Sequence, residues 1–159
     1  MEDQRFKTMR HIETVRNFIS LCVTALLSRS VEHDQSKLQS PEREVFDEYT
    51  PLLRGVTYLS TDYKDMMIKM KPAIDHHNAH NRHHPEHYKN GIKDMTLIDI
   101  LEMLCDWKAA SLRHNDGNLL KSIEVNQERF GYSEDLRRIL ENTAKFLDAS
   151  SAPHHASES

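Results

Sequence analysis

Glycine and proline are scarce in this chain, and their scarcity limits its possible folds more than any other feature. Only 4 Gly and 5 Pro occur in 159 residues, so the sequence holds few of the residues that interrupt helices or form tight turns. No segment alternates apolar and polar residues with the period of two that strands show. The sequence therefore predicts an all-α protein, folded as a single-domain helical bundle of about six helices.

Apolar residues recur at the three- and four-residue spacing of a helix along most of the chain. This spacing predicts a domain over residues 1–148 and a Ser-, Ala- and His-rich disordered tail over 149–159. The helix over 96–114 is apolar around most of its circumference, so we expect it to be central. We expect helices over 5–29, 42–49, 61–83, 96–114, 118–130 and 133–147, with polar breaks at 28–36, 54–60, 89–91 and 115–117.

Charge and cysteine usage narrow the class of protein. The formal net charge is −4, which argues against a basic nucleic-acid-binding surface. No apolar run approaches the ~20 residues of a membrane span, and no segment reads as a signal peptide. Cys22 and Cys105 both fall in apolar helical patterns, so we expect buried thiols in a reducing cytoplasm.

The number and clustering of the histidines are not explained by an ordinary helical domain. The chain contains 11 His, and 6 of them fall between residues 76 and 87. On one helix, His76, His80, His83, His84 and His87 would share a face about 100° wide. A solvated polar face is the plain interpretation. This density favours a metal or phosphate site instead, because imidazole is the commonest metal ligand and its protonated form pairs with phosphate.

Four further positions carry candidate chemistry. His11 lies on the apolar stripe of the first predicted helix, where a metal on one ring nitrogen would help to satisfy a buried imidazole. His33 and Asp34 form an adjacent imidazole–carboxylate pair, and Lys37 lies three residues further on, in reach of an anion held there. Asp106 stands within the apolar helix, where a carboxylate is costly unless it is paired or bound to metal.

The order His11, His33-Asp34, a histidine cluster and Asp106, all on helices, resembles the HD-domain phosphohydrolase superfamily. The run from His33 to Lys37 looks like that superfamily's longer motif, His-Asp-x-Gly-Lys, with Ser36 in place of Gly. The run His83-His84-Pro85-Glu86, with Asp106 on a later helix, is similar to the HD-GYP branch. Pro85 interrupts His-His-Glu, and the Gly-Tyr-Pro motif is absent, so the likeness to that branch is partial.

Three longer strings look like a small family of proteins from bacteria and their phages, which has no assigned reaction. They are NRHHPEHY, LIDILEMLCDWKAAS and KSIEVNQERFG. This likeness covers residues 9–147.

The resemblance implies an HD-like, divalent-metal-dependent phosphohydrolase. His11, His33, Asp34 and Asp106 would bind the metal, and His77, His83 and His84 would act in catalysis or bind a second ion. Phosphate contacts would come from Lys37, His80 and Arg82. This nitrogen and oxygen ligand set suits one or two ions of Mn, Fe, Co, Ni or Zn, which would acidify a water and polarise a phosphoryl oxygen.

The resemblance also implies a substrate and a setting. We expect a nucleoside mono- or triphosphate, or a small nucleotide signal, as substrate, with no nucleic-acid or membrane partner. We expect a homodimer in the cytoplasm, which is the host cytoplasm if a phage encodes the chain. Two alternatives remain: a protein that binds metal or sequesters a nucleotide without hydrolysing it, and a helical interaction module with a pH-sensitive histidine face.

Overall fold

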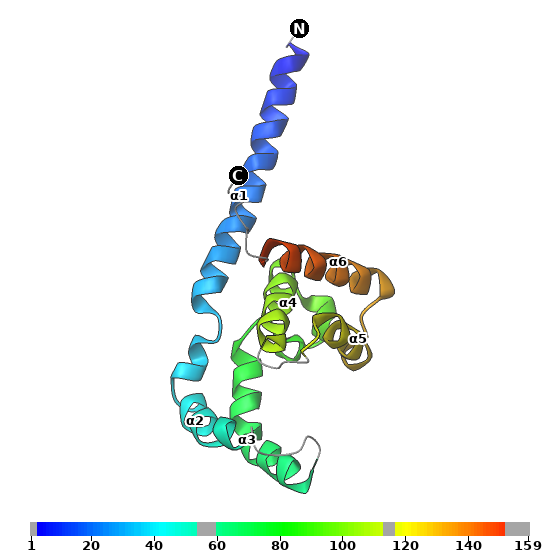
Figure 1. Ribbon diagram of the computed structural model, residues 1–159. Coiled ribbons are helices and arrows are strands. Elements are labelled where there is room, and N and C mark those ends of the chain that lie inside the picture. Colours follow the sequence, from blue (N-terminus) through cyan, green and yellow to red (C-terminus); the bar gives the residue numbers. More distant parts are fainter. Residues whose placement is uncertain (1–2, 54–59, 113–116, 152–159) are drawn as a thin grey trace, which may run out of the picture. The chain divides into compact units, whose positions relative to one another are not determined.

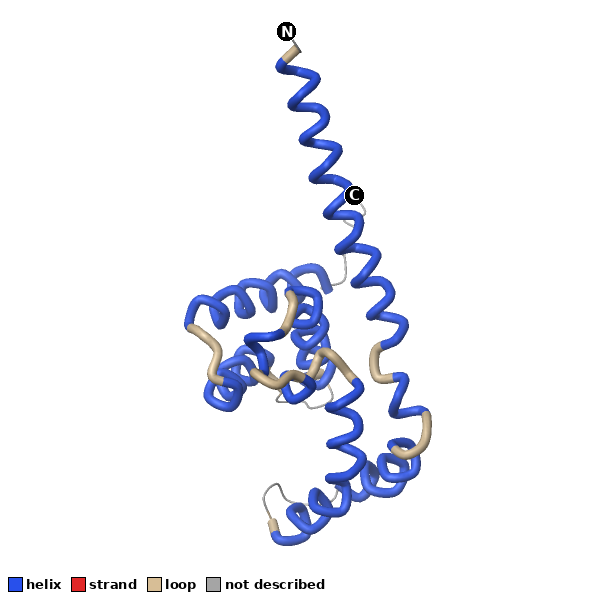
Figure 2. Tube along the Cα trace, turned by 180° about the vertical axis from the view of Figure 1, so that it is seen from behind, coloured by secondary structure: helices blue, strands red, loops and turns tan. Residues whose placement is uncertain are grey.

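The computed structural model describes residues 3–53, 60–112 and 117–151 (Figure 1). These residues form helices joined by loops, with no strand among them (Figure 2), which confirms the all-α prediction. The chain divides into two compact units, Met1–His87 and Tyr88–Ser159, and each is described by itself. The α-helices are α1 (Gln4–Glu32), α2 (Glu42–Leu53), α3 (Thr61–His80), α4 (Leu97–Ser111), α5 (Leu119–Phe130) and α6 (Glu134–Ser151), and the 3-10 helices are η1 (Gln35–Leu38), η2 (Pro85–His87) and η3 (Gly91–Asp94).

Helix α1 runs further than its serines suggest. The predicted polar break at 28–36 begins too early, because Ser28 and Ser30 are both satisfied within the helix. Ser28 Oγ donates to Glu32 Oε1 at 3.1 Å, and Ser30 Oγ donates to the carbonyl of Leu27 at 2.8 Å. The helix therefore continues to Glu32 and ends at His33.

The apolar stripe of α1 is exposed in the part of the chain that the structure describes. No residue of α1 is buried, although the pattern predicted that this stripe faces the core. His11 and Cys22 are both exposed, and Cys105 on α4 is exposed as well. The predicted burial of His11 and of the two thiols is therefore wrong, because helical spacing shows that a helix is amphipathic but not what covers its apolar face.

In the first unit, α2 packs against α3, and η1 packs against both of them. Helix α2 begins with two acidic residues, Glu42 and Glu44, in its first turn, where carboxylates are favoured by the helix dipole. Helix α3 begins after Ser60, whose Oγ accepts a hydrogen bond from the backbone of Tyr63 at 3.2 Å. Pro72 lies inside α3, and the helix continues past it.

Helix α3 ends at His80, three residues earlier than predicted. The next residue, Asn81, takes the extended conformation (φ −113°, ψ 112°), and its side-chain amide donates to the carbonyl of His77 at 2.8 Å. The same carbonyl accepts from the backbone N–H of Asn81 at 3.0 Å, so Asn81 bonds the last turn of α3 through both groups. The prediction of a single helical histidine face over 76–87 is therefore wrong, since His83 and His84 leave the helix.

The second unit is built around an apolar core. Thr96 and Asp99 cap α4 reciprocally, since each side chain accepts from the other residue's backbone N–H. Helices α4, α5 and α6 each contribute two buried side chains to this core, and α5 and α6 both pack against α4. Buried members of this core are Ile92, Met103, Leu104, Leu119, Ile123, Tyr132, Leu140 and Ala144.

Turn residues set the ends of α5 and α6. Gly131 has a φ of 65° directly after α5, a left-handed conformation that glycine adopts without steric cost. Ser133 Oγ then accepts from the backbone of Leu136 at 3.2 Å, as expected of an N-cap. Helix α6 continues to Ser151, so the first three residues of the predicted tail are helical. The remainder of that tail, and most of the predicted breaks at 54–60 and 115–117, lie outside the described residues.

Among the helices that the structure describes, none has the length and apolar character needed to cross a membrane.

Candidate metal centre

Four side chains of the first unit converge on one point. Asp34 follows α1, His77 lies in the last turn of α3, and His83 and His84 lie in the loop after α3. One ligand atom from each of the four lies within 4.8 Å of the other three. The sequence indicated each of these residues separately, and the early end of α3 allows the loop histidines to fold back against His77.

The carboxylate of Asp34 stands at the centre of this group. Its Oδ1 lies 3.2 Å from Nε2 of His77 and 3.5 Å from Nε2 of His83. His77 is 3% exposed and His83 is 2% exposed. Among the described residues, the Oδ1 atom of Asp34 and the Nε2 atom of His77 are buried without a hydrogen bond. Buried polar atoms are normally satisfied, so these two atoms point to a group that both would bind, and a cation fits both.

Glu42 fixes the other side of the His77 ring. Its Oε2 lies 2.8 Å from Nδ1 of His77 and also accepts a hydrogen bond from Ser36 Oγ at 2.9 Å, while the Glu42 side chain is 0% exposed. Burial opposes ionisation of this carboxyl, but the hydrogen bonds from His76, His77 and Ser36 outweigh it and hold its pKa below the usual value. An ionised Glu42 holds a proton on Nδ1 of His77, so an ion that replaced any proton on Nε2 would find that nitrogen already oriented, as it is in histidine ligands of metalloproteins.

Asp34 takes a backbone conformation that few residue types tolerate. Its φ is 57° and its ψ is 12°, in the left-handed region that Asp and Asn enter more easily than other non-glycine residues. Lys37 Nζ lies 2.6 Å from Oδ2 of Asp34. Burial raises the pKa of Asp34, but the contacts with His77 and Lys37 outweigh burial and hold it far below the usual value. Asp34 is therefore a carboxylate at neutral pH.

His33 borders the same group from the end of α1. Its ring centroid lies 4.4 Å from that of His83, and its Nε2 lies 3.7 Å from Oδ2 of Asp34. This ring is half-buried.

The chemistry of the donors fits a transition-metal ion. Three imidazoles and one carboxylate suit Zn, Ni, Co, Fe or Mn better than Mg or Ca, which prefer a shell of oxygen ligands. The group of His and Asp residues described here could therefore hold a metal ion.

Residues 1–148 match a protein family that is described as a family of unknown function, DUF5662. The chain belongs to the DUF5662 family. No curated protein and no solved structure matches it. The description of DUF5662 assigns no reaction to its members.

The structure separates His11 from the rest of the predicted ligand set. In this DUF5662 protein, His11 lies within α1 and His33 ends the same helix, 22 residues later. At a rise of 1.5 Å per residue, the helix holds them about 33 Å apart. His11 and His33 of one chain therefore cannot share an ion, and that part of the predicted set is corrected. Asp106 lies half-buried on α4 in the second unit, and its role as a ligand stays a prediction.

The three predicted phosphate contacts have different surroundings. Lys37 lies beside Asp34, whereas Arg82 and His80 are exposed. His80 stacks on His76 with ring centroids 3.9 Å apart and is not among the four converging residues. Sequence analysis missed Glu42 and Ser36, because an acid in the first turn of a helix has an ordinary local explanation and its partner on α3 is more than thirty residues away.

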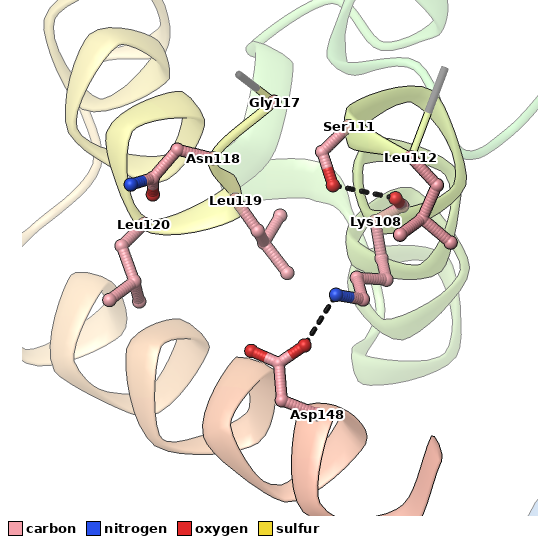
Figure 3. A pocket seen from close by; sticks show the side chains of 8 residues that line it. All are labelled: Lys108, Ser111, Leu112, Gly117, Asn118, Leu119, Leu120 and Asp148. Carbon is pink, nitrogen blue, oxygen red and sulfur yellow. Dashed lines mark hydrogen bonds and ion pairs between the residues drawn. The ribbon is translucent and has the colours of Figure 1, made fainter. Parts of the chain in front are cut away.

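A cavity in the second unit offers different chemistry. It has a volume of about 270 Å³, and Figure 3 shows that Lys108 and Asp148 point toward each other across it. Their charges already neutralise one another, and none of the predicted site residues lines this cavity. Its lining residues are Lys108, Ser111, Leu112, Gly117, Asn118, Leu119, Leu120 and Asp148.

Proposed function

We propose that this DUF5662 protein is a divalent-metal-dependent phosphohydrolase that acts on a nucleotide. The observation that carries the proposal is the convergence of Asp34 with His77, His83 and His84, whose ligand atoms lie within 4.8 Å of one another. Imidazole nitrogens and a carboxylate oxygen are the ligand types that catalytic transition-metal sites use. The substrate class, a nucleoside mono- or triphosphate or a small nucleotide signal, comes from the resemblance to HD-domain enzymes.

In this proposal, Asp34, His77, His83 and His84 hold an ion of Mn, Fe, Co, Ni or Zn. His33 is the proposed further ligand, for the same ion or for a second one. A divalent ion bound there would supply an acidified water as nucleophile and positive charge for a phosphoryl oxygen.

The protein's own side chains have separate tasks. Glu42 holds the ring of His77 in one orientation and one tautomer through Nδ1. Lys37, whose ammonium lies beside Asp34, binds a non-bridging phosphate oxygen, and Arg82 is a second candidate for that contact. A histidine of the cluster that does not bind an ion is placed to contact the phosphate or to give a proton to the leaving oxygen.

The test is metal content and phosphate release by full-length protein without a His tag. Purified protein is assayed for bound metal and then incubated with a nucleotide panel and Mn(II), Co(II) or Ni(II), with inorganic phosphate as the readout. Asp34→Asn should lose both metal and phosphate release, because Asn tolerates the left-handed backbone at this position but carries no charge. Asp47→Asn is the matched control, since Asp47 is an exposed carboxylate on α2, and it should keep both.

Two results would contradict the proposal. Metal retained by Asp34→Asn would remove this residue from the ligand set. Tight metal or nucleotide binding without phosphate release from any nucleotide would identify a binding protein that sequesters its ligand.

A further inference from the structure

Two histidines outside the Asp34 cluster (Asp34, His77, His83 and His84) are oriented for metal binding in the same way. His76 and His80 lie one turn apart on α3, and their rings stack with centroids 3.9 Å apart. Residues four apart lie on the same side of a helix, and histidines at this spacing can hold one ion between them.

The hydrogen bonds of both rings fix which nitrogen is available. His76 Nδ1 lies 2.7 Å from Oε1 of Glu42, and His80 Nδ1 lies 2.7 Å from the carbonyl of His76. A carboxylate and a carbonyl only accept, so each Nδ1 carries the proton and each Nε2 presents its lone pair. Histidines that bind metals almost always give their second nitrogen to such an acceptor.

We propose that His76 and His80 form a second, surface metal site for a transition-metal ion such as Ni(II), Zn(II) or Cu(II). Imidazole nitrogen selects these ions over Mg(II) and Ca(II). His80 is exposed and His76 is half-buried, so water or an external ligand would complete the coordination. This assignment does not depend on the proposed reaction.

Glu42 connects the surface pair to the buried cluster. Its Oε1 contacts His76 and its Oε2 contacts His77, so one buried carboxylate orients a ligand in each site. An ion held by His76 and His80 would stabilise the Glu42 rotamer that also orients His77. Binding at either site should therefore favour binding at the other, since such coupling is reciprocal.

The experiment counts metal equivalents in the full chain. Protein without a His tag, carrying His154→Ala and His155→Ala to remove the histidines near the C-terminus, is titrated with Ni(II) or Zn(II) by calorimetry. His80→Ala and His76→Ala should each weaken one equivalent by at least about tenfold. His87→Ala should keep this equivalent. The Nδ1 atom of His87 also lies 2.7 Å from a carbonyl oxygen, that of Ala79, but His87 does not share a helix with a histidine four residues away.

The outcome that overturns the site is an unchanged number of equivalents in His80→Ala. Exposed His80 is the decisive position, because truncating it leaves the contact of His76 with Glu42 in place, and circular dichroism checks that each variant folds. The resemblance to HD-domain enzymes implied a phosphate contact for His80. A higher KM for nucleotide in His80→Ala, with the metal count unchanged, would restore that interpretation and reject the second site. Loss of the surface equivalent, with the Asp34 equivalent still present at equal or lower affinity, supports the second site, whether or not the protein hydrolyses any nucleotide.

Discussion

Glu42 Oε2 lies 2.8 Å from Nδ1 of His77, and the two side chains are 0% and 4% exposed. The same carboxylate oxygen accepts from Ser36, and the other oxygen lies 2.7 Å from His76. Three partners thus surround one buried acid, so the orientation of His77 is set before any ion arrives. Histidine ligands of metal sites are oriented by partners of this kind.

We expect Glu42→Gln to weaken metal binding at the Asp34 cluster by about 10- to 100-fold, the usual effect of removing the partner that orients a histidine ligand. The amide cannot accept through both of its ends, so the variant should also lose about 1–3 kcal/mol of unfolding free energy. A competition assay with a chelator and urea unfolding measure the two effects. Glu44→Gln removes an exposed acid from the same first turn and should change neither. Equal metal affinity in the two variants would reject the role of Glu42.

The helices of the second unit could be predicted closely, because their boundaries depend on local chemistry. The spacing of apolar residues identifies α4 and α5, Ser133 starts α6, and Gly131 ends α5 with a positive φ. Each of these features involves neighbours in the sequence, so a single chain contains the information needed to predict them.

The candidate metal centre could be predicted only in part, because it depends on contacts between distant segments. The density of histidine and the His33-Asp34 pair identified Asp34, His77, His83 and His84 as candidates. Their arrangement depends on α3 ending at His80, where the Asn81 side chain caps the helix, and helical spacing over 61–83 predicted a later end. The burial of His11 was predicted wrongly for a different reason. Its helix was predicted, but which surface packs against a helix depends on the tertiary structure.

Truncating Ile123 tests the core of the second unit. This side chain is 0% exposed and belongs to the buried apolar cluster of α4, α5 and α6. Ile123→Ala should lower the unfolding free energy of this unit by about 2–5 kcal/mol, since it removes buried apolar surface and leaves a cavity. Emission from Trp107, which packs against that core, reports the transition in urea. Val125→Ala, at a 54% exposed position of the same helix, should cost less than about 0.5 kcal/mol.

Tyr132 should make the second unit sensitive to alkaline pH. Its hydroxyl donates to the carbonyl of Ile123. Burial, reinforced by Glu141 and opposed by Arg137, raises the pKa of Tyr132 to about 12 from an ordinary value of 10. The unfolded chain therefore loses this proton first. The contribution of Tyr132 to the free energy of unfolding should stay constant below about pH 10 and fall as pH rises toward 12.

Urea midpoints measured between pH 8 and pH 12 in the parent protein and in Tyr132→Phe isolate this effect. Tyr132→Phe should be less stable at pH 8 by about 0.5–1.5 kcal/mol, because it loses one hydrogen bond, and should show a shallower decline above pH 10. Tyr63→Phe serves as the control. Parallel declines in the parent protein and in Tyr132→Phe would show that other groups cause the alkaline loss.

Substitutions of Lys37 and of Asp34 should have opposite effects on metal affinity, although the two residues form one ion pair. Lys37 Nζ lies 2.6 Å from Oδ2 of Asp34, so it repels an ion at the cluster and competes for one oxygen of the carboxylate. Lys37→Met should therefore keep or raise metal affinity, whereas Asp34→Asn abolishes it. If Lys37 binds phosphate as proposed, Lys37→Met should also raise the KM for nucleotide by about tenfold or more, the loss expected for a charge-assisted hydrogen bond of 1.5–3 kcal/mol. Lys69→Met, at an exposed position on α3, should change neither quantity. Loss of metal in Lys37→Met would mean that Lys37 maintains the site itself, and the proposed phosphate contact would then be wrong.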